Sequence, residues 1–110
     1  MLFLVRREFK IPQNMPADRL AAVKVQTMTY VLEQMRDGKI LAGGRVVHKP
    51  VTYFICDCGS TAELQSMLAG SPLASFAKDE VTPLLSADEN MERATRLLES
   101  LNAAGIPMRC

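Results

Sequence analysis

The sequence predicts one α+β domain in which four strands and two helices follow the order β-α-β-β-α-β, with a third helix added at the end. Three observations lead to this prediction. Segments with apolar residues at every second position indicate strands, and segments with a 3.6-residue apolar period indicate helices. Serine-led capping boxes and glycines mark where helices begin and end. The 110 residues suit a single domain, and 48% hydrophobic residues are enough for its core.

The first strand is expected at about residues 2–10. Apolar and polar residues alternate there, and Pro12 ends the strand because proline lacks the N–H that the sheet requires. The alternation places Phe3, Val5, Phe9 and Ile11 between Leu4, Arg6, Glu8 and Lys10.

The first helix is expected from Pro16 to about Arg36. Proline fits the first turn of a helix, and Gly38 supplies a left-handed stop. Seven apolar residues fall on one arc of about 140°, which is the side expected against the sheet. They are Leu20, Ala21, Val25, Met28, Val31, Leu32 and Met35. Lys24 and Thr27 fall at one edge of this arc, where Lys24 either extends to solvent or borders a pocket.

The next two strands are expected at residues 40–47 and 51–58, joined by a tight connection at residues 48–50. The glycine pair Gly43-Gly44 interrupts the earlier strand. Paired glycines in a strand indicate either a β-bulge or space cleared for another group, such as a ligand.

A capping box at Ser60 and Glu63 predicts a short helix that ends at Gly70, and a fourth strand is expected at residues 77–84. The region 1–85 therefore contains the whole sheet domain.

A second capping box begins a third helix at residues 86–105, within a C-terminal extension that spans residues 86–110. Its apolar side consists of Met91, Ala94, Leu97, Leu98 and Leu101. This side is too short for an independent coiled coil, so the extension is expected to pack on the same subunit or on a partner.

The order of the elements is that of the ferredoxin-like fold. Two helices cover one face of such a sheet, but the first three strands carry apolar residues on both faces. A sheet that is apolar on both faces needs a second layer. With one short chain, the expected layer is the sheet of a second copy. The prediction is a homodimer, or a higher homo-oligomer built from it, in which two sheets face each other as a dimeric α+β barrel.

Composition excludes several classes of protein. Thirteen basic and twelve acidic residues, no tryptophan and 5% aromatic residues argue against a nucleic-acid partner. The apolar opening at residues 1–5 is too short to span a bilayer, and no cleavage site follows it, so we expect a cytoplasmic protein without a membrane partner.

The chain also lacks the patterns of metal and cofactor sites. His48 is the single histidine, and the three cysteines, Cys56, Cys58 and Cys110, suit neither a disulfide framework nor a zinc site. Cys56 and Cys58 are expected to be small buried hydrophobic residues. No glycine-rich phosphate loop and no Ser-His-Asp order occurs, so the sequence predicts no cofactor.

The sequence resembles the muconolactone isomerase family over about residues 1–85. That family's pattern begins M-L-F-x-V-K/R and ends P-L-x-P…E-V-T-P-L. The similar pieces here are MLFLVR at residues 1–6, Ile11-Pro12 with Met15, Pro72-Leu73, EVTPL at residues 80–84, Gly38 and Arg45. The resemblance implies a ferredoxin-like fold and dimers that assemble further.

Two departures concern the site that the resemblance implies. The family's first helix resembles L-K-A-x-E-K-x, in which the lysine matches Lys24 but the glutamate, the family's general base, falls on Thr27. A threonine hydroxyl is a far weaker base than a carboxylate. The family's second strand opens with tryptophans and a histidine, which residues 39–45 (KILAGGR) replace. Gly43-Gly44 is also similar to the YCII-related family, whose Asp-Pro corresponds to Ser71-Pro72.

The first functional hypothesis is a small-molecule protein that binds or isomerises a small organic acid, lactone or polyketide-like ring by proton transfer. Its substrate-binding residues would be Lys24, Thr27, Gly43, Gly44 and Arg45, with the two cations holding a carboxylate. His48 or Glu80 would supply the proton, although the sequence favours an exposed turn residue for His48 and a solvated strand residue for Glu80. Because Thr27 replaces the glutamate, we do not expect efficient muconolactone isomerisation.

Two other hypotheses remain open. The second is a noncatalytic ligand-binding or assembly module, which the loss of the glutamate and the added third helix favour. The third is a cofactorless cyclase or monooxygenase with the same architecture.

Overall fold

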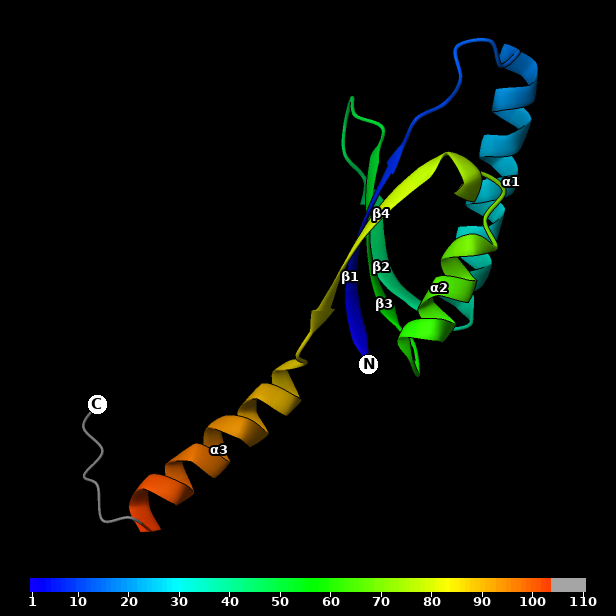
Figure 1. The fold of residues 1–110 in the computed structure, drawn as a ribbon. Coiled ribbons are helices and arrows are strands. Elements are labelled where there is room, and N and C mark those ends of the chain that lie inside the picture. Colours follow the sequence, from blue (N-terminus) through cyan, green and yellow to red (C-terminus); the bar gives the residue numbers. More distant parts are fainter. Residues whose placement is uncertain (104–110) are drawn as a thin grey trace.

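The computed structural model describes residues 1–103 (Figure 1). Its elements are β1 (Leu2–Phe9), α1 (Ala17–Arg36), β2 (Ile40–Arg45), β3 (Val51–Asp57), α2 (Thr61–Ala69), the 3-10 turn η1 (Ala74–Phe76), β4 (Ala77–Leu84) and α3 (Ala87–Ala103). The order is the predicted one.

The four strands form one antiparallel sheet in the order β2-β3-β1-β4. β1 lies between β3 and β4, with Val5 opposite both Phe54 and Val81. Figure 1 shows α1 and α2 on the same side of this sheet. The predicted α+β class and the ferredoxin-like order are therefore confirmed.

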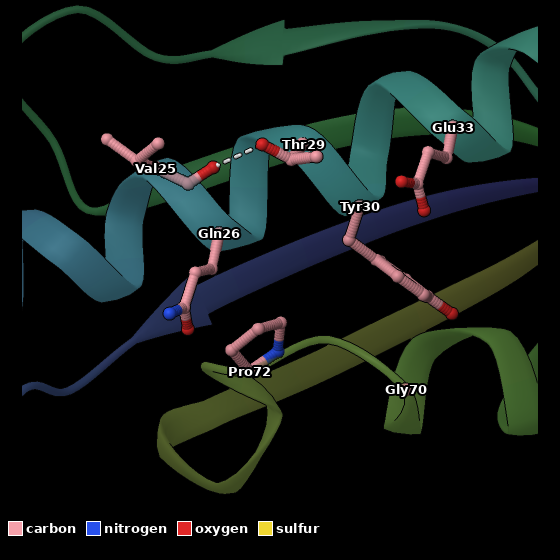
Figure 2. Close-up of a pocket in the computed structure, with 7 residues that line it drawn as sticks. All are labelled: Val25, Gln26, Thr29, Tyr30, Glu33, Gly70 and Pro72. Carbon is pink, nitrogen blue, oxygen red and sulfur yellow. Dashed lines mark hydrogen bonds between the residues drawn. The ribbon is translucent and has the colours of Figure 1, made fainter.

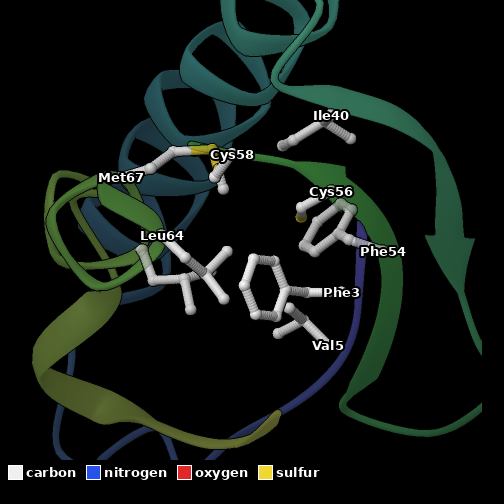
Figure 3. Close-up of a cluster of buried hydrophobic side chains, with 9 residues drawn as sticks. Phe3, Val5, Ile40, Phe54, Cys56, Cys58, Leu64 and Met67 are labelled. Carbon is white, nitrogen blue, oxygen red and sulfur yellow. The ribbon is translucent and has the colours of Figure 1, made fainter. Parts of the chain in front are cut away.

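The hydrophobic core fills the space between the sheet and these two helices (Figure 3). Phe3 and Val5 of β1, Cys56 of β3 and Leu64 of α2 are its most deeply buried side chains. The period-two alternation explains this arrangement, because alternate residues of a strand face the same side. Leu4, between Phe3 and Val5, faces the other side of the sheet and is half-buried.

Helix α1 is less completely covered than its apolar arc predicts. Thr27, expected at the edge of the arc, is the buried residue of this helix, and Val31 and Met35 pack against the core beside it. Val25, Met28 and Leu32 are exposed. The side of the helix that faces the sheet is therefore centred on Thr27. The part of the predicted apolar arc that contains Val25, Met28 and Leu32 is left exposed.

The glycine pair on β2 does not form the bulge that the sequence suggested. The register instead shifts between Ile40 and Ala42. A Cβ atom on Gly43 would clash with the Tyr53 carbonyl oxygen, whereas one on Gly44 would meet nothing within 4 Å. The close approach of β3 therefore accounts for Gly43, and Gly44 leaves open surface.

Helix α3 projects away from the sheet and from α1 (Figure 1). The radius of gyration is 19.6 Å, whereas a compact chain of this length has a value of about 13 Å. The predicted end of this helix at Gly105 and Pro107, like Cys110, lies outside the described residues. No helix within residues 1–103 is both long enough and apolar enough to cross a membrane.

Candidate functional site

Thr27 lies at the centre of the α1 side that faces the sheet, and 9% of it is exposed. Its hydroxyl donates a hydrogen bond of 2.8 Å to the carbonyl oxygen of Val23, one turn earlier. Such a bond to the preceding turn is common for threonine in a helix. It gives the hydroxyl proton an acceptor within the same helix. Lys24 precedes Thr27 by three residues and is exposed. The two residues are therefore neighbours on consecutive turns of one helix.

Arg45 and His48 lie at the hairpin that joins β2 to β3, and both are exposed. The Arg45 Nε atom donates to the carbonyl oxygen of Lys49 over 3.1 Å. His48 adopts a φ of 63°, in the left-handed region, because the chain reverses direction there. Arg45 helps to order the hairpin through this bond, and His48 is a turn residue.

Glu80 lies on β4, directly opposite Arg6 of β1 in the register, and is exposed. β4 and β2 form opposite edges of the sheet. With strands about 4.8 Å apart, those edges are separated by roughly 14 Å. The two predicted proton carriers, Glu80 and His48, are therefore on different edges, and Glu80 is not close to the glycine pair.

Gly43 and Gly44 border an apolar hollow of about 320 Å³ on the face of the sheet opposite the helices. Its lining comes from three adjacent strands and consists of Leu4, Ala42, Gly43, Gly44, Tyr53, Phe54 and Ile55. The missing side chain of Gly44 leaves this hollow open, and Tyr53 supplies the phenol ring beside it. Lys24, Thr27 and Arg45 do not line it.

A second hollow, of about 340 Å³, lies between α1 and the segment that follows α2 (Figure 2). Its lining comprises Val25, Gln26, Thr29, Tyr30, Glu33, Gly70 and Pro72, none of which the sequence singled out as a site residue. The Tyr30 hydroxyl donates to the carbonyl oxygen of Met67 over 2.6 Å, and burial raises the pKa of this phenol. A Cβ atom on Gly70 would lie 2.5 Å from that hydroxyl, so glycine permits the contact.

Sequence reasoning missed a buried ion pair between β1 and β4. The Arg7 guanidinium donates two hydrogen bonds to the Asp79 carboxylate, of 2.7 and 2.9 Å, and a third of 2.7 Å to the carbonyl oxygen of Leu68 on α2. The Arg7 side chain is only 5% exposed. The signal was present in the alternation, because Arg7 has the same parity as Phe3 and Val5. This pair joins α2 to two strands.

The remaining polar groups of the core do not form a metal site. Among residues 1–103, no group of three or more His, Cys, Asp or Glu side chains is placed to hold a metal ion. Cys56 and Cys58 are buried and unpaired, and burial raises the pKa of the Cys56 thiol to about 11. Ser71 is also buried, and its hydroxyl has no hydrogen-bond partner within the described chain.

The order of the elements and of the strands in the sheet defines a small ferredoxin-like α+β protein. A profile of the muconolactone delta-isomerase family matches residues 1–90. The chain therefore belongs to the muconolactone delta-isomerase family. That match ends in the first turn of α3, so nearly all of this helix lies beyond it.

Individual relatives agree with this assignment. The chain is 38% identical over 84 residues to a muconolactone delta-isomerase of Cupriavidus pinatubonensis. This alignment covers 76% of this chain and 91% of that protein. It is 39% identical over 84 residues to muconolactone delta-isomerase 1 of Acinetobacter lwoffii. That alignment covers 76% of this chain and 88% of the relative.

Two solved structures share the fold. A crystal structure of muconolactone isomerase superposes with a TM-score of 0.72 at 24% identity, covering 78% of this chain and 90% of that one. The 5-chloro-2-hydroxyhydroquinone dehydrochlorinase of Burkholderia phenoliruptrix superposes with a TM-score of 0.59 at 20% identity, covering 80% and 97%. The fold therefore occurs in proteins that are named for different activities, and the residues of the site must decide the function.

Proposed function

We propose that this chain binds, and slowly isomerises, a small organic acid, lactone or related ring, and that it is not an efficient muconolactone isomerase. Family membership supports the class of ligand, because the curated relatives are named muconolactone delta-isomerases. We assign the binding of the ligand's carboxylate to Lys24 and Arg45, of which the arginine is the better bidentate partner.

The observation that carries this proposal is the state of Thr27. The residue is buried and its hydroxyl donates to the Val23 carbonyl oxygen, so this hydrogen bond fixes the orientation of the side chain on the helix. A neutral hydroxyl cannot accept a proton near pH 7 as a carboxylate does, and general-base assistance is worth about 10²–10⁴-fold in rate. His48 and Glu80 remain the candidate proton carriers of a slower reaction.

The alternative function is a noncatalytic ligand-binding or assembly module. Two observations favour it: the hydrogen-bonded Thr27 and the α3 extension that the family match does not include. In this alternative, the chain retains the ligand contacts of Lys24 and Arg45 but carries out no proton transfer.

We further propose that the chain forms a homodimer through the open face of the sheet. Leu4, Tyr53 and Ile55 give this face an apolar centre around the hollow at Gly44. Burial of this surface by the same surface of a second copy would satisfy the two-fold symmetry of a homodimer.

The functional test compares muconolactone turnover by the parent chain, Thr27→Glu and the matched control Thr29→Glu. Thr29 makes the same bond to the preceding turn, 2.9 Å to the Val25 carbonyl oxygen, but it is exposed. We expect slow or no turnover by the parent, a gain of about 10²-fold for Thr27→Glu and no gain for Thr29→Glu. Turnover by the parent at ordinary enzyme rates would contradict the proposal.

Binding is measured separately, by NMR titration of the parent with muconolactone. We expect Lys24→Met and Arg45→Met to weaken binding and Lys49→Met, on the same hairpin as Arg45, to leave it unchanged. Binding without turnover in the parent and in Thr27→Glu would favour the noncatalytic alternative. If muconolactone is neither bound nor turned over, the proposed class of ligand is wrong.

The homodimer is tested by sedimentation at micromolar concentration. Ile55→Arg places a charge at the centre of the open face and should produce monomers. Val47→Arg, at an exposed position of the β2–β3 hairpin, should leave the mass unchanged. A parent chain that sediments as a monomer would overturn this part of the proposal.

A further inference from the structure

Within residues 1–103, two apolar helix surfaces are exposed and uncovered by other described residues. The outer stripe of α1 consists of Ala21, Val25, Met28 and Leu32, and its three larger residues are 55–68% exposed. The α3 seam consists of Met91, Ala94, Leu98 and Leu101, of which Met91 is 69% and Leu98 43% exposed. Two helices of one small chain therefore each present an aligned apolar row to solvent, which is unusual unless another surface covers it.

The two rows match each other in spacing and length. The residues of the outer stripe are separated by four, three and four positions, and those of the α3 seam by three, four and three. This alternation is the spacing with which paired helices interdigitate their side chains. At 1.5 Å per residue, the outer stripe is about 17 Å long and the α3 seam about 15 Å.

The two helices also have opposite net charges. α1 carries three basic and two acidic residues. Lys24 and Arg36 flank the outer stripe, as does Asp18 at its N-terminal end. α3 carries four acidic and two basic residues, with Asp88, Glu92 and Glu99 on one side of it. Opposite charges beside two apolar rows favour their association and select the partner surface.

Within one chain the two rows cannot meet in the observed arrangement. Two residues, Leu85 and Ser86, separate β4 from α3, and α3 continues away from α1 rather than turning back (Figure 1). We propose that the α3 seam of one chain packs against the outer stripe of α1 in a second copy. This contact depends neither on a bound ligand nor on the packing of sheet against sheet.

The proposal is tested by introducing opposite charges on the two sides of the contact. Leu98→Glu and Met28→Lys each place a charge in one row, and both positions are exposed, so the domain should fold normally by circular dichroism. We expect each variant to weaken self-association by at least about tenfold in sedimentation experiments. An equimolar mixture of the two variants should regain association. In a mixed pair, the α3 that carries Leu98→Glu packs on the α1 that carries Met28→Lys, so the introduced carboxylate meets the introduced ammonium group, and the reciprocal contact joins two unsubstituted rows.

Matched controls place the same charges on the other sides of the helices. Ser100→Glu on α3 and Gln26→Lys on α1 should not change self-association. If Leu98→Glu has no effect, the α3 seam is not an interface. If Leu98→Glu weakens association but Met28→Lys does not, or if the mixture fails to recover, α3 packs elsewhere and the proposal is wrong. Ile55→Arg reports separately on the sheet-to-sheet contact.

Discussion

The sheet domain and helix α3 are built from similar local signals but differ in what covers them. α2 and α3 each begin at a serine whose hydroxyl accepts the amide of a glutamate three residues later, over 3.1 Å in both cases. α2 buries Leu64, Met67 and Leu68 in the core, whereas no residue of α3 is buried among the described positions. The difference shows that an amphipathic pattern specifies a helix and its contact side but not the partner of that side.

The largest expected contrast is between the buried arginine–carboxylate pair of the sheet domain and the exposed pair of α3. Asp79→Ala leaves the buried guanidinium of Arg7 without its partner and should destabilise the domain by about 3–5 kcal/mol. Glu92→Ala removes the exposed pair with Arg96 on α3 and should cost less than about 1 kcal/mol. Urea denaturation of both variants measures the difference. Equal losses would mean that burial does not make the Arg7–Asp79 pair more important for stability than the exposed pair.

The second prediction concerns the stability of the sheet domain at alkaline pH, where its buried thiol Cys56 ionises. The pKa of Cys56 is raised by burial to about 11, against 9.0 in the unfolded chain. The thiol ionises first in the unfolded chain, so the free energy of unfolding should fall above pH 9 and continue to fall up to about pH 11. The slope from this group is at most about 1.4 kcal/mol per pH unit.

Cys56→Ala provides the control for this alkaline effect. It should lower stability at pH 7 but remove the Cys56 part of the decrease above about pH 9. Cys58, whose pKa is also raised by burial, would retain its own contribution to the decrease. Parallel stability curves for the parent and Cys56→Ala would contradict the assignment.

The smallest expected effects concern the two serine caps. Ser60→Ala and Ser86→Ala each remove one hydrogen bond to a helix N-terminus, a change typically worth about 1 kcal/mol. Because α2 is packed in the core, Ser60→Ala should lower the unfolding midpoint of the domain. Ser86→Ala should reduce helical circular dichroism without moving that midpoint. A shift of the midpoint by both variants would mean that α3 unfolds together with the sheet domain.

The features that depend on neighbouring residues were predictable from the sequence. The alternation of β1, the stop at Gly38 and both serine caps follow from local geometry, and the structure contains each of them. The family resemblance also correctly predicted the ferredoxin-like order of strands and helices in residues 1–85. In these cases the physical cause lies within a few residues of the feature.

The features that depend on distant residues were not predictable in the same way. Arg7 and Asp79 are 72 positions apart, and nothing local shows that they meet. The sequence identified the apolar residues of α1 but not which of them face the sheet, because the covering surface comes from segments distant in the sequence. Val31 and Met35 pack against the core, whereas Met28 and Leu32 are exposed. The same limit explains the bulge, which lies beside Ile40 rather than at the glycine pair.

Hydrogen–deuterium exchange at several protein concentrations tests most directly whether α3 is covered by a second copy while the sheet domain is stable by itself. Amides of β1, β3 and α2 should be protected at every concentration, because their contacts lie within one chain. Amides of α3 should exchange rapidly in dilute solution and become protected as the concentration rises. Protection of α3 that is independent of concentration, or its absence even in concentrated solution, would contradict the account.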